Sequence, residues 1–599
     1  MMNANSLGEA IAQSCAAHAE KTALMYKSDG AYRSITYQEL GLSASAVAIE
    51  LLQQGVNPGD RIALISANRP EWAMVDIACL MIGAVPVPIY TSLSAAQVQY
   101  IIKDSGASIL FAENERLAAK ARDLKSSGDL KSLYLFERAE SPPPDETHLQ
   151  ALLEQNKGKT SAHDDGVLKL RRNVERDQLA TLIYTSGTTG LPKGVMLTHG
   201  NLLANMEGVM EILDVGPGDV MLSLLPLAHV FERLAGHFLP LCHGATVAYA
   251  QSPRTVAKEL MEVKPTLMLA VPRFYEKMQA RIEEAGAKGS IIKRKIFNWA
   301  IKTGRRASQR TRKPHTGLRY RLADRLVFSK LKERTGGRLR FFVSGGAALP
   351  AEVAKFFYAA GILIIEGYGL TEASPILNVN RPENFRFGTV GQPLPNVEIK
   401  IAADGEILAK GPNIMQGYLN LPKETRSTLP EDGFLRTGDL GRLEDDGFLT
   451  ITGRKKEIMV TSSGRNIAPM PIENLLKSSP YIAEIMLVAD GRPYVTALIV
   501  PDFERFEAEG IGEVNSSGSL DPADLVQSKQ VLRLIEYEIS RLSAGLAEYE
   551  RIVRFTLMPR EFSIEEGELT PTMKIKRDVL LEKFADLINE MYETKDTRR

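Results

Sequence analysis

The residues with the clearest chemical character lie at 182–194, where the sequence reads LIYTSGTTGLPKG. An apolar run of strand length leads directly into glycines, which allow sharp turns and a close approach of the backbone to a ligand. Hydroxyls, backbone N–H groups and an ammonium that face one small volume form a cradle for phosphate oxygens. The spacing matches neither the GxxxxGK[ST] loop nor the GxGxxG fingerprint. A flexible surface turn is the alternative, and we favour a phosphate-binding loop, whose members are Thr185, Ser186, Gly187, Thr188, Thr189, Gly190 and Lys193.

Four later segments also combine turns with polar side chains, and each has an ordinary structural explanation when taken alone. The segment 344–349 (SGGAAL) reads as a strand–helix turn, and 366–372 (EGYGLTE) as the end of a buried strand. In 436–441 (RTGDLG) a carboxylate stands in a tight turn, where aspartate often accepts hydrogen bonds from its own backbone. The segment 568–576 (ELTPTMKIK) reads as a solvated basic surface.

Taken together, these motifs resemble the adenylate-forming superfamily, which includes acyl-CoA synthetases, luciferases and peptide-synthetase adenylation domains. They occur in the expected order from about residue 20 to about residue 577. The resemblance implies that ATP and Mg²⁺ bind, with Thr371 at the α-phosphate and with Thr185 and Glu372 at the metal. It implies further nucleotide contacts at Gly345, Gly346, Ala347, Tyr368, Gly369, Asp439 and Arg454.

The same resemblance assigns roles in the reaction. Lys574 corresponds to the catalytic lysine of the family's last motif, and Lys456 in GRKK corresponds to the pivot of a mobile C-terminal domain. His229, in PLAHVFER at 226–233, lies beside the substrate carboxylate in relatives, although an isolated histidine is more often structural. Gly464 resembles the glycine that lines the pantetheine tunnel of CoA after the domain has rotated.

The residue sequences of several motifs resemble those of long-chain acyl-CoA synthetases most. These motifs are PLAHVFER, VPRFYEK at 271–277, FRFGTVGQPLP at 385–395 and PTMKIKR at 571–577. Amino-acid-activating relatives carry an aspartate near the histidine, and residues 228–231 supply none. Some fatty-acyl relatives carry a tryptophan gate a few residues later, where Arg233 stands here. The resemblance therefore implies that a long-chain fatty acid reacts with ATP to give acyl-AMP, and that the acyl group is then transferred to CoA.

Two alternatives remain open at this point. An acyl-AMP ligase would share the first half-reaction and deliver the acyl group to a carrier protein. A non-catalytic nucleotide-binding regulator could use the same fold, but every catalytic position is filled. No GxSxG elbow occurs, so a serine hydrolase is not indicated.

The pattern of apolar runs predicts an α/β fold. Strand-length runs at 61–65, 84–88, 109–112, 182–185, 246–249, 266–270 and 340–344 alternate with helical segments, which indicates parallel sheets with crossover helices. After about residue 385, short strands with glycine-rich turns indicate antiparallel hairpins or a small barrel. The resemblance implies a large N-terminal adenylation domain, 1–452, of two packed α/β sheets plus a small β-barrel portion. It implies a mobile α+β C-terminal domain at 453–599.

Composition and charge are those of a globular protein. Lys plus Arg and Asp plus Glu both number 73, so the balance argues against a nucleic-acid-binding protein as a whole. The three cysteines lie far apart, which excludes a disulfide scaffold and is compatible with a cytoplasmic enzyme. The uncharged stretch at 77–102 contains prolines and polar residues, which favours a buried helix, a strand and a loop over a membrane span. Residues 293–340 carry 17 basic and two acidic side chains, which suggests peripheral contact with an anionic membrane or else a solvated helix surface.

Overall fold

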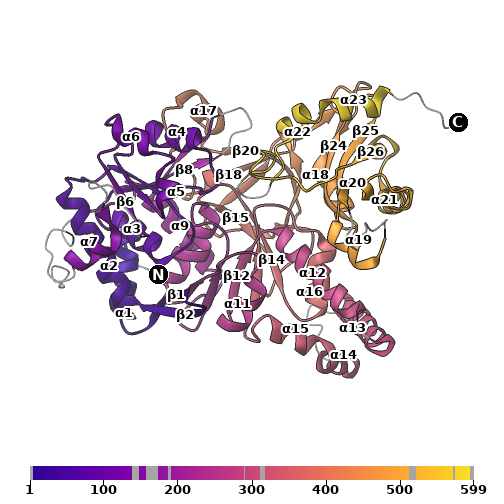
Figure 1. Cartoon of the computed structure of the whole chain (residues 1–599), viewed down its shortest axis with the longest axis horizontal. Coiled ribbons are helices and arrows are strands. Elements are labelled where there is room, and N and C mark those ends of the chain that lie inside the picture. Colours follow the sequence, from indigo (N-terminus) through magenta and orange to yellow (C-terminus); the bar gives the residue numbers. More distant parts are fainter. Residues whose placement is uncertain are drawn as a thin grey trace.

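The computed structural model describes residues 4–137, 147–156, 167, 173–185, 191–288, 290–310, 317–511, 521–570 and 574–593. The chain forms a large body that contains two main sheets and a smaller C-terminal part, drawn in orange to yellow (Figure 1). Ser186–Gly190, the centre of the predicted phosphate loop, lies outside the described residues.

The smaller main sheet is parallel and has the strand order β4 (Val85–Ile89), β3 (Arg61–Ile65), β5 (Ile109–Ala112), β6 (Ser132–Leu135), β7 (Thr147–His148). The chain passes from β3 through helix α3 (Pro70–Met81) to β4, and then through α4 (Ala95–Ser105) to β5 on the other side of β3. All residues of α3 except Glu71 are buried. The predicted strands at 61–65, 84–88 and 109–112 and the prediction of a helix, a strand and a loop within 77–102 are therefore confirmed.

The larger main sheet has nine strands. Its parallel centre is formed by β14 (Ile364–Gly369), β13 (Phe341–Ser344), β12 (Leu267–Ala270), β10 (Val220–Ser223), β11 (Thr246–Tyr249) and β1 (Thr22–Ser28). The antiparallel strands β2 (Ala31–Thr36), β15 (Ile376–Val379) and β16 (Gln392–Pro393) complete its edges. Strands β12 and β13 are short and almost wholly buried, as expected where helices cover both faces of a parallel sheet.

One predicted strand has a different setting from the one its sequence suggested. Residues 182–185 belong to β8 (Leu179–Thr185), which pairs antiparallel with β9 (Lys193–Thr198), not with the parallel strands. Strand β19 (Gly417–Tyr418) adds to β9 and completes a three-stranded sheet. The expectation of a crossover after β8 was wrong, because β8 and β9 are neighbours along the chain that pair antiparallel as a hairpin.

The short strands and glycine-rich turns predicted after about residue 385 correspond to a separate antiparallel sheet. Its four strands follow the order β17 (Glu398–Ile401), β18 (Glu406–Lys410), β20 (Leu435–Leu443), β21 (Leu449–Arg454). The C-terminal part has its own sheet of β24 (Ile482–Val488), β25 (Val495–Pro501) and β26 (Ile552–Leu557). Helices α18 (Pro469–Leu476) and α21 (Lys529–Leu542) contribute to one apolar cluster beside this sheet, and α22 (Arg577–Lys583) and α23 (Ala585–Glu593) contribute to another. The α/β architecture with a small α+β C-terminal part is therefore confirmed.

Four helices form a projection from the large body between β12 and β13. They are α12 (Pro272–Ala287), α13 (Ile291–Arg310), α14 (Leu318–Ala323) and α15 (Ser329–Arg334), with a π-helical turn η2 (Asp324–Phe328) joining the last two. In Figure 1, α13, α14 and α15 lie along the lower edge of the molecule. Among the described residues, no helix is both long enough and apolar enough to cross a membrane.

Candidate active site

The predicted phosphate loop joins two paired strands, so its ends are fixed. Thr185 on β8 lies opposite Lys193 on β9 in the register of the hairpin. The Lys193 ammonium lies 5.2 Å from the centre of the Tyr418 ring. The Tyr418 hydroxyl in turn donates a 2.8 Å hydrogen bond to Oε1 of Glu372. This arrangement brings a hydroxyl, an ammonium and a carboxylate to the base of the loop.

A second group of side chains surrounds the Asp439 carboxylate on β20. The Tyr368 hydroxyl donates to Oδ2 at 2.8 Å, and Nε of Arg454 donates to Oδ1 at 2.7 Å. Asp439 is only 5% exposed. Strand pairing places Asp439 directly opposite Arg454, so the two residues meet through the geometry of the β20–β21 hairpin. The structure thus joins the motifs at 366–372, 436–441 and 453–456 into one cluster.

His229 and Lys574 face each other across the centre of the molecule. Burial, with a smaller effect from the positive charge of Lys574, lowers the pKa of His229 to about 4. The ring is therefore neutral near pH 7, and Nδ1 accepts from the backbone N–H of Phe231 at 3.1 Å, which leaves the proton on Nε2. Lys574 is exposed within the open cleft. The surrounding protein removes part of its hydration, and this desolvation, together with the positive charge of Arg454, lowers the pKa of Lys574.

Most of the predicted site residues line one large cavity of about 1600 Å³. Its polar part is lined by Thr185, Lys193, Gly345, Gly346, Tyr368, Gly369, Thr371, Glu372, Arg454, Lys456 and Lys574. The same cavity is also lined by residues of α9 (His199–Met210) and of strands β10, β12 and β13 in the nine-stranded sheet. We call the apolar part of this lining the inner branch, and it consists of Val209, Leu213, Val215, Met221, Val230, Ala235, Leu239, Leu267, Leu269, Phe341 and Val343.

A second cavity of about 1000 Å³ reaches the same centre from another side. His229, Gly346 and Lys574 line both cavities, and Ala347 lines the second. The second cavity is lined by residues of both the large body and the C-terminal part, and Leu331, Arg334 and Thr335 are among them. The backbone at Gly345 must lack a side chain, because a Cβ there would lie 2.8 Å from the Phe231 ring.

Gly464 lies apart from these residues. It occupies a turn with φ of +77° and is not among the residues that line either cavity. The hinge candidate Lys456 lies in a single turn of 3₁₀ helix, Lys455–Glu457, directly after β21.

Arg233 has a different environment from a gate residue. Its side chain is 2% exposed, and its guanidinium pairs with Asp76, with Nε 3.0 Å from Oδ2. It also donates to Thr181 at 2.7 Å. Arg233 lies in a π-helix, Glu232–Phe238, whose seven residues are all buried. These buried contacts of Arg233 therefore fix this segment in the interior.

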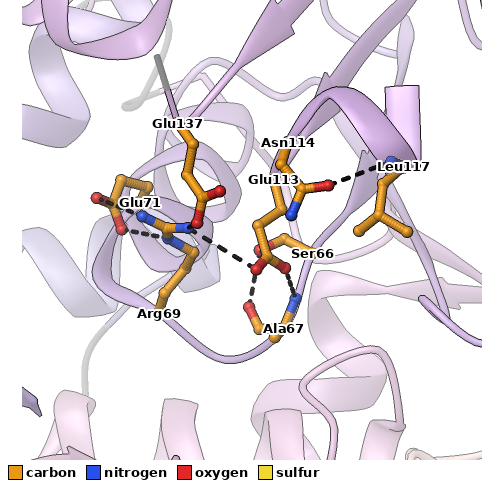
Figure 2. Close-up of polar contacts among 8 residues, drawn as sticks. All are labelled: Ser66, Ala67, Arg69, Glu71, Glu113, Asn114, Leu117 and Glu137. Atoms are coloured by element: carbon orange, nitrogen blue, oxygen red, sulfur yellow. Dashed lines mark hydrogen bonds and ion pairs between the residues drawn. The ribbon is translucent and has the colours of Figure 1, made fainter. Parts of the chain in front are cut away.

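The motif search missed the residue that holds the segment leading to His229. Asn68 follows β3, and its Nδ2 donates to the carbonyl of Leu225 at 2.7 Å, while its Oδ1 accepts from the N–H of Leu227 at 2.9 Å. The loop that carries Asn68 is itself held by carboxylates. Figure 2 shows Arg69 paired with Glu71 and Glu137, and Glu113 accepting from the N–H of Ala67. Apart from the Arg69–Glu71 pair, these contacts join residues more than 40 positions apart, so no local pattern could have revealed them.

Comparisons with known proteins agree with this geometry. The family model described as AMP-binding enzyme matches residues 11–419. This chain belongs to that family of adenylate-forming enzymes. The model described as AMP-binding enzyme C-terminal domain matches residues 456–596 of the enzyme.

Several relatives extend over nearly the whole enzyme. It is 37% identical to the long-chain-fatty-acid–CoA ligase FadD15 of Mycobacterium bovis, over 94% of this chain and 93% of the relative. It is 32% identical to the long-chain-fatty-acid–CoA ligase ACSBG1 of Rattus norvegicus, over 96% and 83% of the two chains.

The fold is also similar to solved structures of low sequence identity. The A domain of the carboxylic acid reductase from Segniliparus rugosus, in complex with AMP and a co-purified carboxylic acid, has a TM-score of 0.76 at 20% identity and covers 99% of this chain and 95% of that one. The anthranilate CoA ligase AuaEII, in complex with anthranoyl-AMP, has a TM-score of 0.73 at 20% identity, over 98% and 99%. The enzyme is therefore an adenylate-forming ligase that activates acyl groups and binds adenine nucleotide.

Proposed function

We propose that this enzyme is a long-chain fatty acid–CoA ligase, which converts a fatty acid and ATP to acyl-AMP and pyrophosphate and then transfers the acyl group to CoA. The observation that carries the proposal is the apolar inner branch of the large cavity. Its lining residues are all apolar, and they line the same cavity as His229 and Lys574. Such a space suits an unbranched hydrocarbon chain whose carboxylate stays at the polar end.

The first half-reaction joins two anions, because the carboxylate attacks the α-phosphorus of ATP and pyrophosphate leaves. Positioning and positive charge should therefore supply most of the rate enhancement, without a protein nucleophile. Lys574 would lie between the carboxylate and the α-phosphate, where charge develops. Its lowered pKa arises from desolvation within the cleft and from the charge of Arg454, and bound anionic substrates would favour the charged form. The neutral His229 would donate from Nε2 to the substrate carboxylate.

The nucleotide would be held by the two clusters described above. Asp439, supported by Arg454, would accept from the ribose hydroxyls, and Tyr368, Gly345, Gly346 and Ala347 would flank the adenine. Thr185, Lys193, Thr371 and the loop at 186–190 would contact the phosphates. Glu372 offers a carboxylate and Thr185 a hydroxyl, which fit Mg²⁺ because this ion takes few protein ligands in addition to phosphates. When bound, Mg²⁺ supplies positive charge at the phosphates.

The second half-reaction requires a thiol to reach the acyl carbonyl, where Lys574 stands in the first. We propose a division of the enzyme at 452/453, with rotation of the C-terminal domain about Lys456. Such a rotation would withdraw Lys574 and bring Gly464 to the centre, and sequential assembly of a site is a known way to order two reactions. The two-domain division is supported by the separate matches at 11–419 and 456–596.

The deciding experiment is ATP–pyrophosphate exchange over a series of saturated fatty acids, followed by CoA-dependent release of AMP. We expect exchange to rise with chain length until the inner branch is filled. A preference for acetate over palmitate would refute the long-chain assignment. If exchange occurs without CoA-dependent AMP release, and a carrier protein accepts the acyl group, the enzyme is instead an acyl-AMP ligase.

We also propose that the enzyme is cytoplasmic and meets an anionic membrane through residues 293–340, where its substrate would be concentrated. Support comes from the net charge of this segment, +15 in a chain that is neutral overall. All three cysteines are buried and none forms a disulfide, as suits a reducing compartment.

A further inference from the structure

Within the projection, the part formed by α13, α14, η2 and α15 exposes apolar side chains in a regular pattern. Leu318 is 86% exposed, Leu322 is 51% exposed and Leu326 is 41% exposed. They are spaced four residues apart, so they lie on one side of the continuous helical segment formed by α14 and η2. We call these three residues the leucine stripe.

The opposite side of this helical segment is anchored in the protein. Tyr320, Ala323 and Phe328 are buried, and with Ala300 of α13 and Ala360 they form a small apolar cluster. The segment therefore has an apolar side that packs inward and a second apolar side that faces solvent. A helix that is apolar on two sides has an unused contact surface, and solvent-exposed leucines at helical spacing mark an interaction site more often than isolated ones do.

Positive charge surrounds the leucine stripe. Arg319, Arg321 and Arg325 are exposed on the same helical segment, next to the leucines. The start of α13 repeats this composition, because Ile291 and Ile292 are 65% and 70% exposed and the next three residues are Lys293, Arg294 and Lys295. Helices with exposed apolar residues bordered by arginine and lysine are typical of segments that lie in the interface of anionic membranes.

We propose that the leucine stripe inserts into the acyl region of an anionic lipid bilayer, with Arg319, Arg321 and Arg325 at the level of the lipid phosphates. This inference rests on the membrane contact proposed above and goes beyond it, because it assigns the contact to a specific helical segment and makes it partly hydrophobic. The arginines bind phosphate and hold the segment at the surface, and the leucines are removed from water.

The positive charge of the projection, together with its exposed leucines, favours one binding partner for this surface over two others. A second copy of the chain would bring an equal positive charge against the first, since both copies carry +15 at 293–340. A nucleic acid would pair with the arginines but leave the leucines in water. An anionic bilayer complements both features at once.

The position of the leucine stripe also connects it with the active site. The helical segment continues directly into α15, and Leu331 and Arg334 of α15 are among the residues that line the second cavity. That cavity extends to His229 and Lys574. A fatty acid that leaves a bilayer at the leucine stripe therefore emerges beside a passage whose walls include Leu260, Met278 and Ile282 and which ends at the reaction centre.

The first test measures co-sedimentation of the full-length enzyme with phosphatidylcholine vesicles, with and without phosphatidylglycerol. Replacing all three leucines (Leu318→Ser, Leu322→Ser, Leu326→Ser) should weaken binding to anionic vesicles by on the order of 100-fold, since three partly exposed leucines lose their burial in lipid. The matched control is Leu42→Ser on α2 (Tyr37–Gln53), because Leu42 is 43% exposed on the large body. This control should bind as the unmodified enzyme does.

The second test reports insertion directly. All three native cysteines are buried, so Leu322→Cys supplies one accessible thiol for an environment-sensitive fluorophore. The emission should shift to shorter wavelength with anionic vesicles and stay unchanged with phosphatidylcholine alone. Ligase activity on a water-soluble short-chain acid should be the same in every variant, because the leucine stripe lies outside the site.

Each result has a distinct meaning. If the triple leucine variant binds as tightly as the unmodified enzyme and the fluorophore stays in water, insertion is wrong, while a purely electrostatic membrane contact stands. If the unmodified enzyme ignores anionic vesicles at low salt, both membrane proposals fall and the ligase assignment is untouched. If light scattering shows a dimer that the leucine changes dissociate, the leucine stripe is a contact between copies and the proposal is overturned.

Discussion

Arg233 and Asp76 form an ion pair in the interior, between the π-helix that follows His229 and helix α3 that follows β3. The two side chains are 2% and 0% exposed, and Nε lies 3.0 Å from Oδ2. Arg233 lies 5.6 Å from the Trp72 ring and 5.2 Å from the Phe238 ring, so aromatic faces border the charge. This pair ties the segment beside the proposed acyl entrance to the smaller parallel sheet.

The ion pair makes a prediction about stability. Asp76→Ala leaves the guanidinium buried without its carboxylate, and removal of one partner of a buried pair typically costs about 3–5 kcal/mol. We expect a decrease of that size in the free energy of unfolding, measured by urea denaturation. The double variant Asp76→Leu with Arg233→Met should lose much less, because no isolated charge remains. Equal losses in the two variants would show that packing, not charge pairing, governs this position.

The second prediction concerns the first half-reaction. Lys574→Ala should lower the rate of acyl-AMP formation by on the order of 10²–10³-fold, the scale for loss of one group that stabilises transition-state charge. Pyrophosphate exchange measures this step. Thioester formation from supplied acyl-AMP should persist, because Lys574 would have left the centre by then. Lys576→Ala, two residues along, serves as the matched control, and an equal loss in both half-reactions would contradict the assigned role.

The third prediction concerns the proposed hinge. Lys456 lies in the single 3₁₀ turn after β21, and proline fixes φ near −65° and removes a backbone donor. Lys456→Pro should therefore trap one arrangement of the two domains. Because Lys574 lines the cavity in the arrangement described here, we expect adenylation to be retained and CoA-dependent turnover to collapse. Lys456→Ala separates loss of the side chain from loss of rotation, and normal overall turnover of the proline variant would refute the pivot.

The sequence predicted the local elements of the fold because their signals are local. Runs such as 61–65 and 109–112 are apolar over strand length, and the structure has strands at those positions. The sequence did not predict which strand each run pairs with. The run at 182–185 has the same apolar pattern as the other runs, yet it forms a hairpin with β9. Pairing depends on which segments the packed chain brings together, and a single run carries no record of it.

In the candidate site, too, the local motifs could be predicted from the sequence and the long-range contacts could not. Tyr368, Asp439 and Arg454 lie in recognisable motifs, and they meet in the structure. Tyr418 and Asn68 lie in no motif that the sequence analysis singled out, and their contacts with Glu372 and Leu225 join residues 46 and 157 positions apart. Long-range contacts of this kind leave no periodicity in the sequence, so only the folded chain reveals them.

The last prediction concerns pH and rests on Glu232, the first residue of the buried π-helix. Complete burial raises the pKa of its carboxyl to about 8, so the folded enzyme holds this proton at neutral pH, whereas the unfolded chain releases it above about pH 4.5. Between these two values the folded state binds more protons, and stability should fall as pH rises, by up to about 1.4 kcal/mol per pH unit from this one group. Above about pH 8 both states are ionised and the loss should level off. Glu232→Gln keeps the shape and cannot ionise, so its melting temperature should exceed that of the unmodified enzyme by an amount that grows from pH 5 to pH 8. Glu431→Gln, at an exposed position, measures the effect of removing one surface charge at each pH. A difference between Glu232→Gln and the unmodified enzyme that stays constant across this range would show that Glu232 is ionised in the folded enzyme throughout.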